Sequence, residues 1–176
     1  MAFKLTAGTV FPVMTVSRLG GGTLELGLPS NGNVWQMVVV YRGKHCPLCA
    51  RYLTQLQEMI DDFHALGVDV VAVSADPEEK AAANIADLGI TIPVGYDLSI
   101  EQMQTLGLYI SHPRSAKETD RPFAEPGLFI INDAGLLQVI DISNGPFVRP
   151  ELQALLNGLR FIRDPVNEYP IRGTYD

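Results

Sequence analysis

The chain has two cysteines, Cys46 and Cys49, and the sequence Cys46-Pro47-Leu48-Cys49 separates them by two residues. They lie between a β-rich apolar run and a stretch with helical apolar spacing, so the pair is expected at the start of a helix. The unpaired N–H groups and the dipole of a helix start favour a thiolate over a thiol. Lys44, and His45 when protonated, would add positive charge beside the pair. Two cysteines at this spacing can close into a disulfide, so they predict redox chemistry.

Two other roles for the cysteines are weaker. Zinc would usually need a second Cys or His pair at ligand spacing, and His45, His64 and His112 supply none. Two buried structural thiols remain the other alternative. No metal and no cofactor is therefore assigned.

The two cysteines are expected to play different parts. Cys46 lies nearer the helix start and should be more exposed, so we expect it to be the nucleophile, with a pKa in the range of about 3.5–7.5. Cys49, one turn into the helix, should resolve the oxidised product. A peroxide would convert Cys46 to a sulfenic acid that Cys49 condenses to a disulfide. A disulfide substrate would react through a mixed disulfide, and either route needs a thiol reductant.

Composition sets broad limits on the function. A chain of 176 residues with 47% hydrophobic content can bury a full core and is expected to form one domain, residues 1–176. The net charge of −7 argues against nucleic acid or an anionic membrane as the main partner. No secretory signal and no apolar run of about 20 residues is apparent, which predicts a cytoplasmic protein. In that compartment a close cysteine pair is more often catalytic or metal-binding than structural.

The apolar patterns predict alternating strands and helices. We expect a hairpin (13–17 with 23–26), a buried strand (34–41) and a helix that starts at the cysteine pair (47–66). A second strand (68–75) and helix (76–88) follow, then a short strand (90–94) and a short helix (99–106). A loop (112–126), two strands (128–132 and 136–142) and a final helix (150–162) complete the chain. This order is that of an α/β thioredoxin-like fold, with a central mixed sheet flanked by helices and an N-terminal β-hairpin. Asp76 is expected to cap its helix, and residues 164–176 form a tail that either packs back or reaches a partner.

Several short stretches resemble one known family. They are Gly8-Thr9-Val10-Phe11-Pro12, Val71-Ala72-Val73-Ser74-Ala75-Asp76, Tyr96-Asp97, Gly127-Leu128-Phe129-Ile130-Ile131-Asn132 and Pro146-Phe147-Val148-Arg149. In this order and spacing the chain resembles the peroxiredoxins of the AhpC/TSA family. The resemblance implies antioxidant activity, that is, thiol-dependent peroxide reduction with Cys46 as the attacking residue.

The chain also departs from the family pattern. Gly43 stands where peroxiredoxins carry a threonine, and Pro126 stands where they often carry an arginine. A proline at position 126 resembles the cis-proline that faces the cysteine pair of thioredoxin, which predicts a cis Glu125–Pro126 bond. Arg149 matches the family arginine that reaches the attacking cysteine, and Arg42 is a further candidate to stabilise a thiolate. The centre therefore resembles that of peroxiredoxin-like proteins with a CPxC motif.

We expect an oxidoreductase that reduces hydroperoxides through a Cys46/Cys49 dithiol–disulfide cycle and so contributes to cell redox homeostasis. Its reductant would be a thioredoxin-like protein or a small thiol. A thiol–disulfide oxidoreductase acting on protein disulfides is the alternative. A copper chaperone using His45 is a weaker one, because such proteins use a CxxxC spacing and a distant histidine. A binding module without turnover is disfavoured by the intact cysteine pair. The oligomeric state stays open, a homodimer included.

Overall fold

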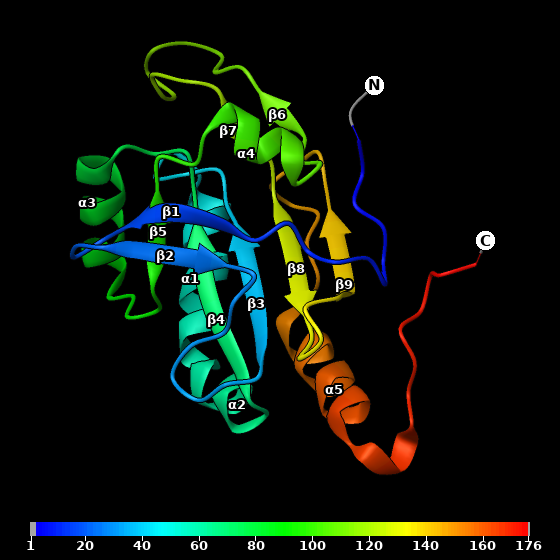
Figure 1. The fold of residues 1–176 in the computed structure, drawn as a ribbon. Helices are drawn as coiled ribbons and strands as arrows, with labels where there is room; N and C mark the ends of the chain where they lie inside the picture. The colour runs from blue at the N-terminus through cyan, green and yellow to red at the C-terminus, as the bar shows by residue number, and fades with distance from the viewer. Residues whose placement is uncertain (1–2, 176) are drawn as a thin grey trace.

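A seven-stranded mixed sheet organises residues 3–175, which are the part of the chain described by this computed structural model (Figure 1). The strand order is β2-β1-β5-β4-β3-β8-β9, and β6 and β7 form a separate pair. The strands are β1 (Met14–Arg18), β2 (Thr23–Leu26), β3 (Trp35–Val40), β4 (Val68–Val73), β5 (Val94–Tyr96), β6 (Ile110–Ser111), β7 (Phe123–Ala124), β8 (Gly127–Ile131) and β9 (Leu137–Ile142). Strands β3, β4 and β5 run parallel, whereas β8 pairs antiparallel with β3 and β9. The predicted thioredoxin-like fold class is confirmed.

The helices are α1 (Pro47–Glu58), α2 (Ile60–Ala65), α3 (Glu78–Leu88), α4 (Ile100–Thr105) and α5 (Leu152–Arg163), followed by the 3₁₀ turn η1 (Pro165–Asn167). The single helix predicted over residues 47–66 is divided at Met59, whose φ of −103° and ψ of 3° depart from helical values. Helix α3 ends at Gly89 with a left-handed φ of 65°, a conformation that glycine adopts without strain.

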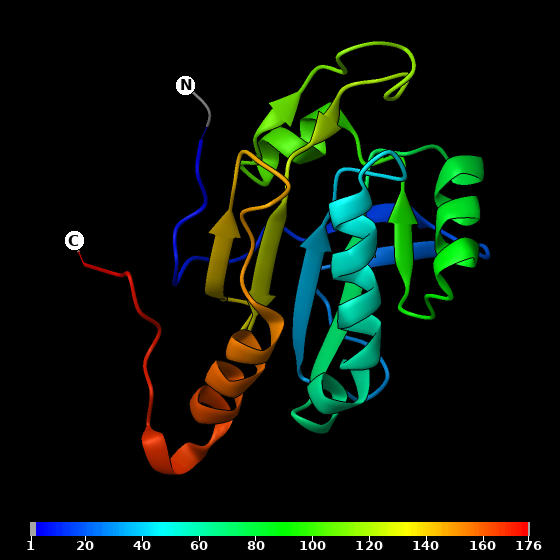
Figure 2. The ribbon, with the colours of Figure 1, turned by 180° about the vertical axis from the view of Figure 1, so that it is seen from behind.

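The two faces of the sheet bury different elements. On one face, β3 and β4 pack against α1 and α5 through residues such as Met37, Val70, Leu53 and Leu156. The other face is covered by the β1–β2 hairpin and α4, with Leu26 and other apolar side chains in that core. Figure 1 shows the hairpin crossing in front of β4, and Figure 2 shows α1 and α5 on the opposite side. Because β3 and β4 are covered on both faces, each of their residues is buried.

Some local expectations were wrong. The short strand expected at 90–94 is Val94–Tyr96, because Ile90 and Ile92 instead pack as core residues before the strand begins. The loop expected at 112–126 ends in the two-residue strand β7, which pairs with β6. The hairpin joins the main sheet through antiparallel pairing of β1 with β5. None of the helices within residues 3–175 is both long enough and apolar enough to cross a membrane.

The C-terminal tail lies against the domain. The ring of Tyr169 packs edge-on against Phe161 of α5, with 5.5 Å between the centroids. Farther along, a Cβ added to Gly8 would lie 3.0 Å from Thr174 Cγ2, so the tail runs beside the N-terminal segment. Contacts to the domain are thus made at Tyr169 and Thr174, while most residues of 164–175 are exposed, and Asp176 lies outside the described residues.

Candidate active site

The cysteines lie where the parallel strands end at one edge of the sheet. The chain leaves β3 at Val40 and enters α1 at Pro47, so the short loop between them carries Cys46 to the helix start. In the sheet register, Val40 is opposite both Val73 of β4 and Gly127 of β8. This register brings the residues that follow β4 and those that precede β8 to the same edge as the cysteine pair.

Cys46 is the N-cap of α1, as the sequence indicated. Its Sγ accepts a hydrogen bond from the backbone N–H of Cys49 at 3.2 Å, so the sulfur occupies the position of a capping oxygen. Pro47 follows at the first helical position, where its missing N–H costs nothing. Cys46 was expected to be exposed, but only 1% of it is accessible, and Cys49 is fully buried. Both are free thiols in this structure.

The surroundings give the two thiols opposite acidities. The pKa of Cys46 is lowered to about 6 as the net of several effects. Hydrogen bonding with the Cys49 thiol lowers it most, burial opposes the shift, and the backbone N–H of Cys49, Arg42 and Arg149 also lower it. Burial raises the pKa of Cys49 far above its usual value, and donation of its proton to Cys46 raises it again. These shifts favour the thiolate on Cys46 and the proton on Cys49. The geometry supports Cys46 as nucleophile, although burial contradicts the exposure argument made for it.

Arg149 reaches the pair from a segment 100 residues away, but it contacts the other cysteine. Its Nη2 donates to Cys49 Sγ at 2.7 Å, whereas the family resemblance implied a contact with the attacking Cys46. The guanidinium also lies over the ring of Tyr52, 5.1 Å from the centroid, and the Tyr52 hydroxyl donates to the Pro150 carbonyl. Tyr52 thus fixes the arginine beside the cysteines.

Arg42 is held by two carboxylates that the sequence did not indicate. Its Nε lies 3.2 Å from Glu125 Oε2 and its Nη2 lies 3.8 Å from Glu118 Oε1, while the guanidinium stacks on Phe123 at 4.8 Å. Both glutamate side chains are less than a tenth exposed. Because these acids offset the charge of Arg42, it is a weaker source of positive potential for Cys46 than its position suggests. No local pattern marks either acid, since the contacts arise from tertiary packing.

Asp76 does not cap its helix. The N-cap of α3 is Pro77, and Asp76 is 2% exposed, with its Oδ2 accepting the backbone N–H of Lys44 at 2.7 Å. Burial raises the pKa of this carboxyl, and the Lys44 hydrogen bond opposes the rise. A Cβ added to Gly43 would lie 2.7 Å from Asp76 Oδ1, and Gly43 has a φ of +133°. Asp76 thus occupies the space that a threonine side chain at position 43 would need.

Pro126 is near the site, but its peptide bond differs from the prediction. No peptide bond among the described residues is cis, so the expected cis Glu125–Pro126 bond is wrong. Around this trans bond, the Glu125 N–H donates to the Tyr109 carbonyl and the Pro126 carbonyl accepts from Ser143, as antiparallel pairing on both sides requires. Pro126 and Arg149 line the same small void of about 10 Å³ beside β3. Pro126 therefore does not have the geometry of the cis-proline of thioredoxin.

His45 adds no charge to the pair at neutral pH. Burial and then Arg42 lower the pKa of its imidazole, and the ring packs on Phe123 with 4.5 Å between centroids. Both ring nitrogens are buried without a hydrogen-bond partner in the described part of the chain. In residues 3–175, no three His, Cys, Asp or Glu side chains are grouped to hold a metal ion.

Comparison with known proteins identifies the family. The sequence profile of the AhpC/TSA family matches residues 7–140, and the chain therefore belongs to the AhpC/TSA family. A protein of Mycobacterium tuberculosis named as a candidate peroxiredoxin is 27% identical over 106 residues, which are 60% of this chain and 66% of that protein. This chain thus aligns with slightly less than two thirds of that relative's length.

Solved structures of peroxiredoxins share the fold. Peroxiredoxin 6 of Arenicola marina aligns with a TM-score of 0.77 at 20% identity, over 92% of this chain and 75% of that one. A peroxiredoxin-like protein of Aquifex aeolicus gives 0.74 at 18% identity, over 90% and 88%. The peroxidoxin BcpB of Mycobacterium tuberculosis gives 0.73 at 17% identity, over 91% and 99%. At these identities the likeness establishes the fold alone.

The pKa of Cys46 predicts the pH dependence of its reactivity. Alkylation of the reduced protein by iodoacetamide should lose about tenfold in rate for each pH unit below about 6 and level off above it, because only the thiolate reacts. Cys49→Ser keeps a hydroxyl donor toward Cys46, so the midpoint of the pH dependence of alkylation should stay low. Cys49→Ala removes the donor and should raise that midpoint. Identical midpoints in the two variants would contradict the hydrogen bond as the main cause.

The Asp76 contact predicts why threonine does not fit at position 43. Gly43→Thr should lower the free energy of unfolding in urea by more than the roughly 1–3 kcal/mol of a strained positive φ, because its side chain meets a buried carboxylate. Gly21→Thr is the control, since Gly21 has a φ of +107°, nearer to that of Gly43, and has nothing within 4 Å of an added Cβ. Equal losses in the two variants would show that Asp76 does not limit this position.

Proposed function

We propose that the protein is a thiol peroxidase that reduces hydroperoxides through a disulfide between Cys46 and Cys49. The observation that carries this proposal is the geometry of the pair at the start of α1, where Cys46 Sγ caps the helix and accepts the Cys49 N–H, and Arg149 donates to Cys49 Sγ. The opposite pKa shifts of the two thiols agree with it. Membership of the AhpC/TSA family supports a thiol-dependent redox role for such a pair.

The first step is attack of the Cys46 thiolate on one oxygen of the hydroperoxide. An S–O bond forms, the O–O bond breaks, and the leaving oxygen takes a proton to depart as alcohol or water. Positive potential for the leaving oxygen is available from the N-terminus of α1 and from Arg149. With no threonine hydroxyl at Gly43 and with Arg42 paired to glutamates, we expect this step to be slower than in a peroxiredoxin with the full set of groups.

The second step depends on a change in Cys49. While Cys46 is a thiolate, it accepts the Cys49 proton and its charge raises the pKa of Cys49. Conversion of Cys46 to a neutral sulfenic acid removes both effects, whereas the Arg149 guanidinium still lowers the pKa of Cys49. Cys49 can then lose its proton and attack the Cys46 sulfur, forming the S–S bond and releasing the hydroxyl group as water.

A reductant completes the cycle. Two thiols, on a thioredoxin-like protein or on two small molecules, supply two electrons and two protons and restore both cysteines. We place this cycle in the cytoplasm, where such thiols stay reduced.

Reduction of protein disulfides by the same pair is the second candidate, favoured by the CxxC spacing. That candidate no longer has the support of a cis-proline facing the cysteines.

Replacing Cys46 and replacing Cys49 should have different effects on peroxide turnover. Cys46→Ser should abolish peroxide turnover, because the ionised sulfur is lost. Cys49→Ser should allow one oxidation that stops at a Cys46 sulfenic acid, detectable by dimedone labelling and mass spectrometry. Stopped-flow mixing of reduced protein with hydrogen peroxide, beside its reduction of a model disulfide, separates the two functions. A peroxide rate no greater than that of a free thiol of equal pKa, with rapid disulfide exchange, would favour the reductase.

Arg149 should act mainly on the second step. Arg149→Ala should slow closure of the disulfide from the sulfenic acid by about tenfold or more, since a hydrogen bond to a charged group contributes about 1.5–3 kcal/mol. In this variant the Cys46 sulfenic acid should accumulate and be trapped by dimedone even though Cys49 is present. Arg149→Lys, which keeps the charge but loses the planar fork, should be intermediate. If Arg149→Ala slows sulfenic acid formation more than closure, Arg149 serves the attacking cysteine instead.

A further inference from the structure

A basic depression lies at the segment that leads into Cys46. It has a volume of about 650 Å³, and its lining includes Lys44, Lys80, Arg114 and Lys117, with Glu118 as its one carboxylate. His45, the residue before Cys46, also lines it. The chain as a whole carries a net charge of −7, so this concentration of cations is opposite in sign to the protein that surrounds it.

Two of these cations are available to a ligand. Arg114 is paired with Glu118 at 3.2 Å, and Lys80 lies 3.7 Å from Asp120. Lys44 and Lys117 are exposed and form no ion pair with any residue in 3–175. Their positive charge is therefore offset only by solvent and by more distant groups.

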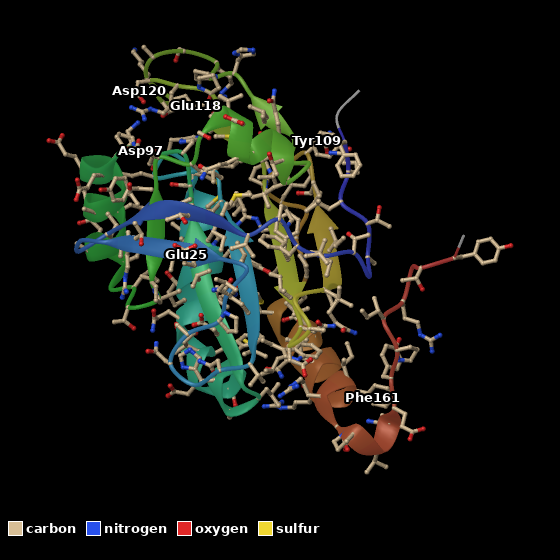
Figure 3. The ribbon with its side chains drawn as sticks, in the orientation of Figure 1. Glu25, Asp97, Tyr109, Glu118, Asp120 and Phe161 are labelled. Carbon is tan, nitrogen blue, oxygen red and sulfur yellow. The ribbon has the colours of Figure 1, made fainter. Side chains whose placement is uncertain are left out.

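The loop that carries Lys117 is attached to the rest of the site. The backbone N–H of Arg114 donates to Glu118 Oε2 at 2.6 Å, and the Glu118 side chain also contacts Arg42. Lys80 Nζ of α3 donates to the Thr119 hydroxyl at 2.9 Å, and Thr119 is buried. Figure 3 shows Glu118 and Asp120 on this loop, close to Asp97 at the same end of the molecule. The loop thus holds its cations over the depression.

We propose that this depression binds the carboxylate of a small molecule that reacts at Cys46. Neutral hydrogen peroxide gains nothing from two unpaired lysines, but an anion would be concentrated beside the cysteine. The carboxylate has two sources, a carboxylate-bearing hydroperoxide or a carboxylate-bearing thiol that reduces the disulfide. In the thiol case, two molecules transfer two electrons and two protons and leave as their own disulfide. The proposal rests on the redox cycle proposed above.

The thiol source is tested on protein oxidised beforehand with diamide, so it does not need peroxidase activity. Thioglycolate, 2-mercaptoethanol and cysteamine carry negative, zero and positive charge, and their rates are compared per thiolate. We expect the anionic thiol to react fastest and the preference to fall at high salt. Lys117→Glu should lower the thioglycolate-to-cysteamine rate ratio by about two- to fivefold, the effect of an exposed charge contact. Arg51→Glu, the same charge change at an exposed α1 residue outside the depression, should alter it less.

The hydroperoxide source is tested by oxidising reduced protein with a carboxylate-bearing organic hydroperoxide and with its methyl ester. If the acid reacts faster than its methyl ester and Lys117→Glu reduces this preference, the depression binds the substrate. If the anionic thiol is preferred and Lys117→Glu reduces that preference, the depression binds the reductant. The proposal is overturned if neither arm shows a charge preference that Lys117→Glu weakens more than Arg51→Glu. Failure of hydrogen peroxide to oxidise Cys46 would contradict only the peroxidase, because the thiol arm starts from the preformed disulfide.

Discussion

Hydrogen bonding to the buried Cys46 sulfur at the first turn of α1 is the interaction on which this site depends. The Cys46 sulfur accepts the backbone N–H of Cys49 at 3.2 Å, and hydrogen bonding with the Cys49 thiol also lowers the pKa of Cys46, so a negative charge there is stabilised without exposure to water. Burial alone would have raised the pKa of Cys46, as it does for Cys49. The difference between the two pKa shifts therefore comes from the direction of hydrogen bonding at the first turn of α1.

The surrounding groups keep that turn in place. The buried Asp76 side chain accepts the N–H of Lys44, and Gly43 provides the space for this carboxylate. On the other side, Tyr52 holds Arg149 against Cys49. These contacts join the end of β3, the end of β4 and the segment before α5, so the cysteines depend on the whole sheet edge for their geometry.

The charge around the site is arranged unevenly. Glu118 and Glu125 offset Arg42, whereas Arg149 faces the cysteines without a carboxylate partner among the described residues. Arg149 is therefore the cation whose effect survives when Cys46 loses its charge. The resemblance to the family located this arginine, but in the structure it contacts Cys49 rather than Cys46.

The sequence by itself determined the order of elements and the helix start at the cysteine pair. These follow from local patterns, namely apolar periodicity, a proline at the first helical position and the spacing of two cysteines. Tertiary structure decided the burial of Cys46, the trans bond before Pro126 and the carboxylate partners of Arg42. It also placed Arg149 on Cys49, a contact between residues 100 positions apart. Such contacts depend on how the strands are ordered and packed, and no local pattern records that arrangement.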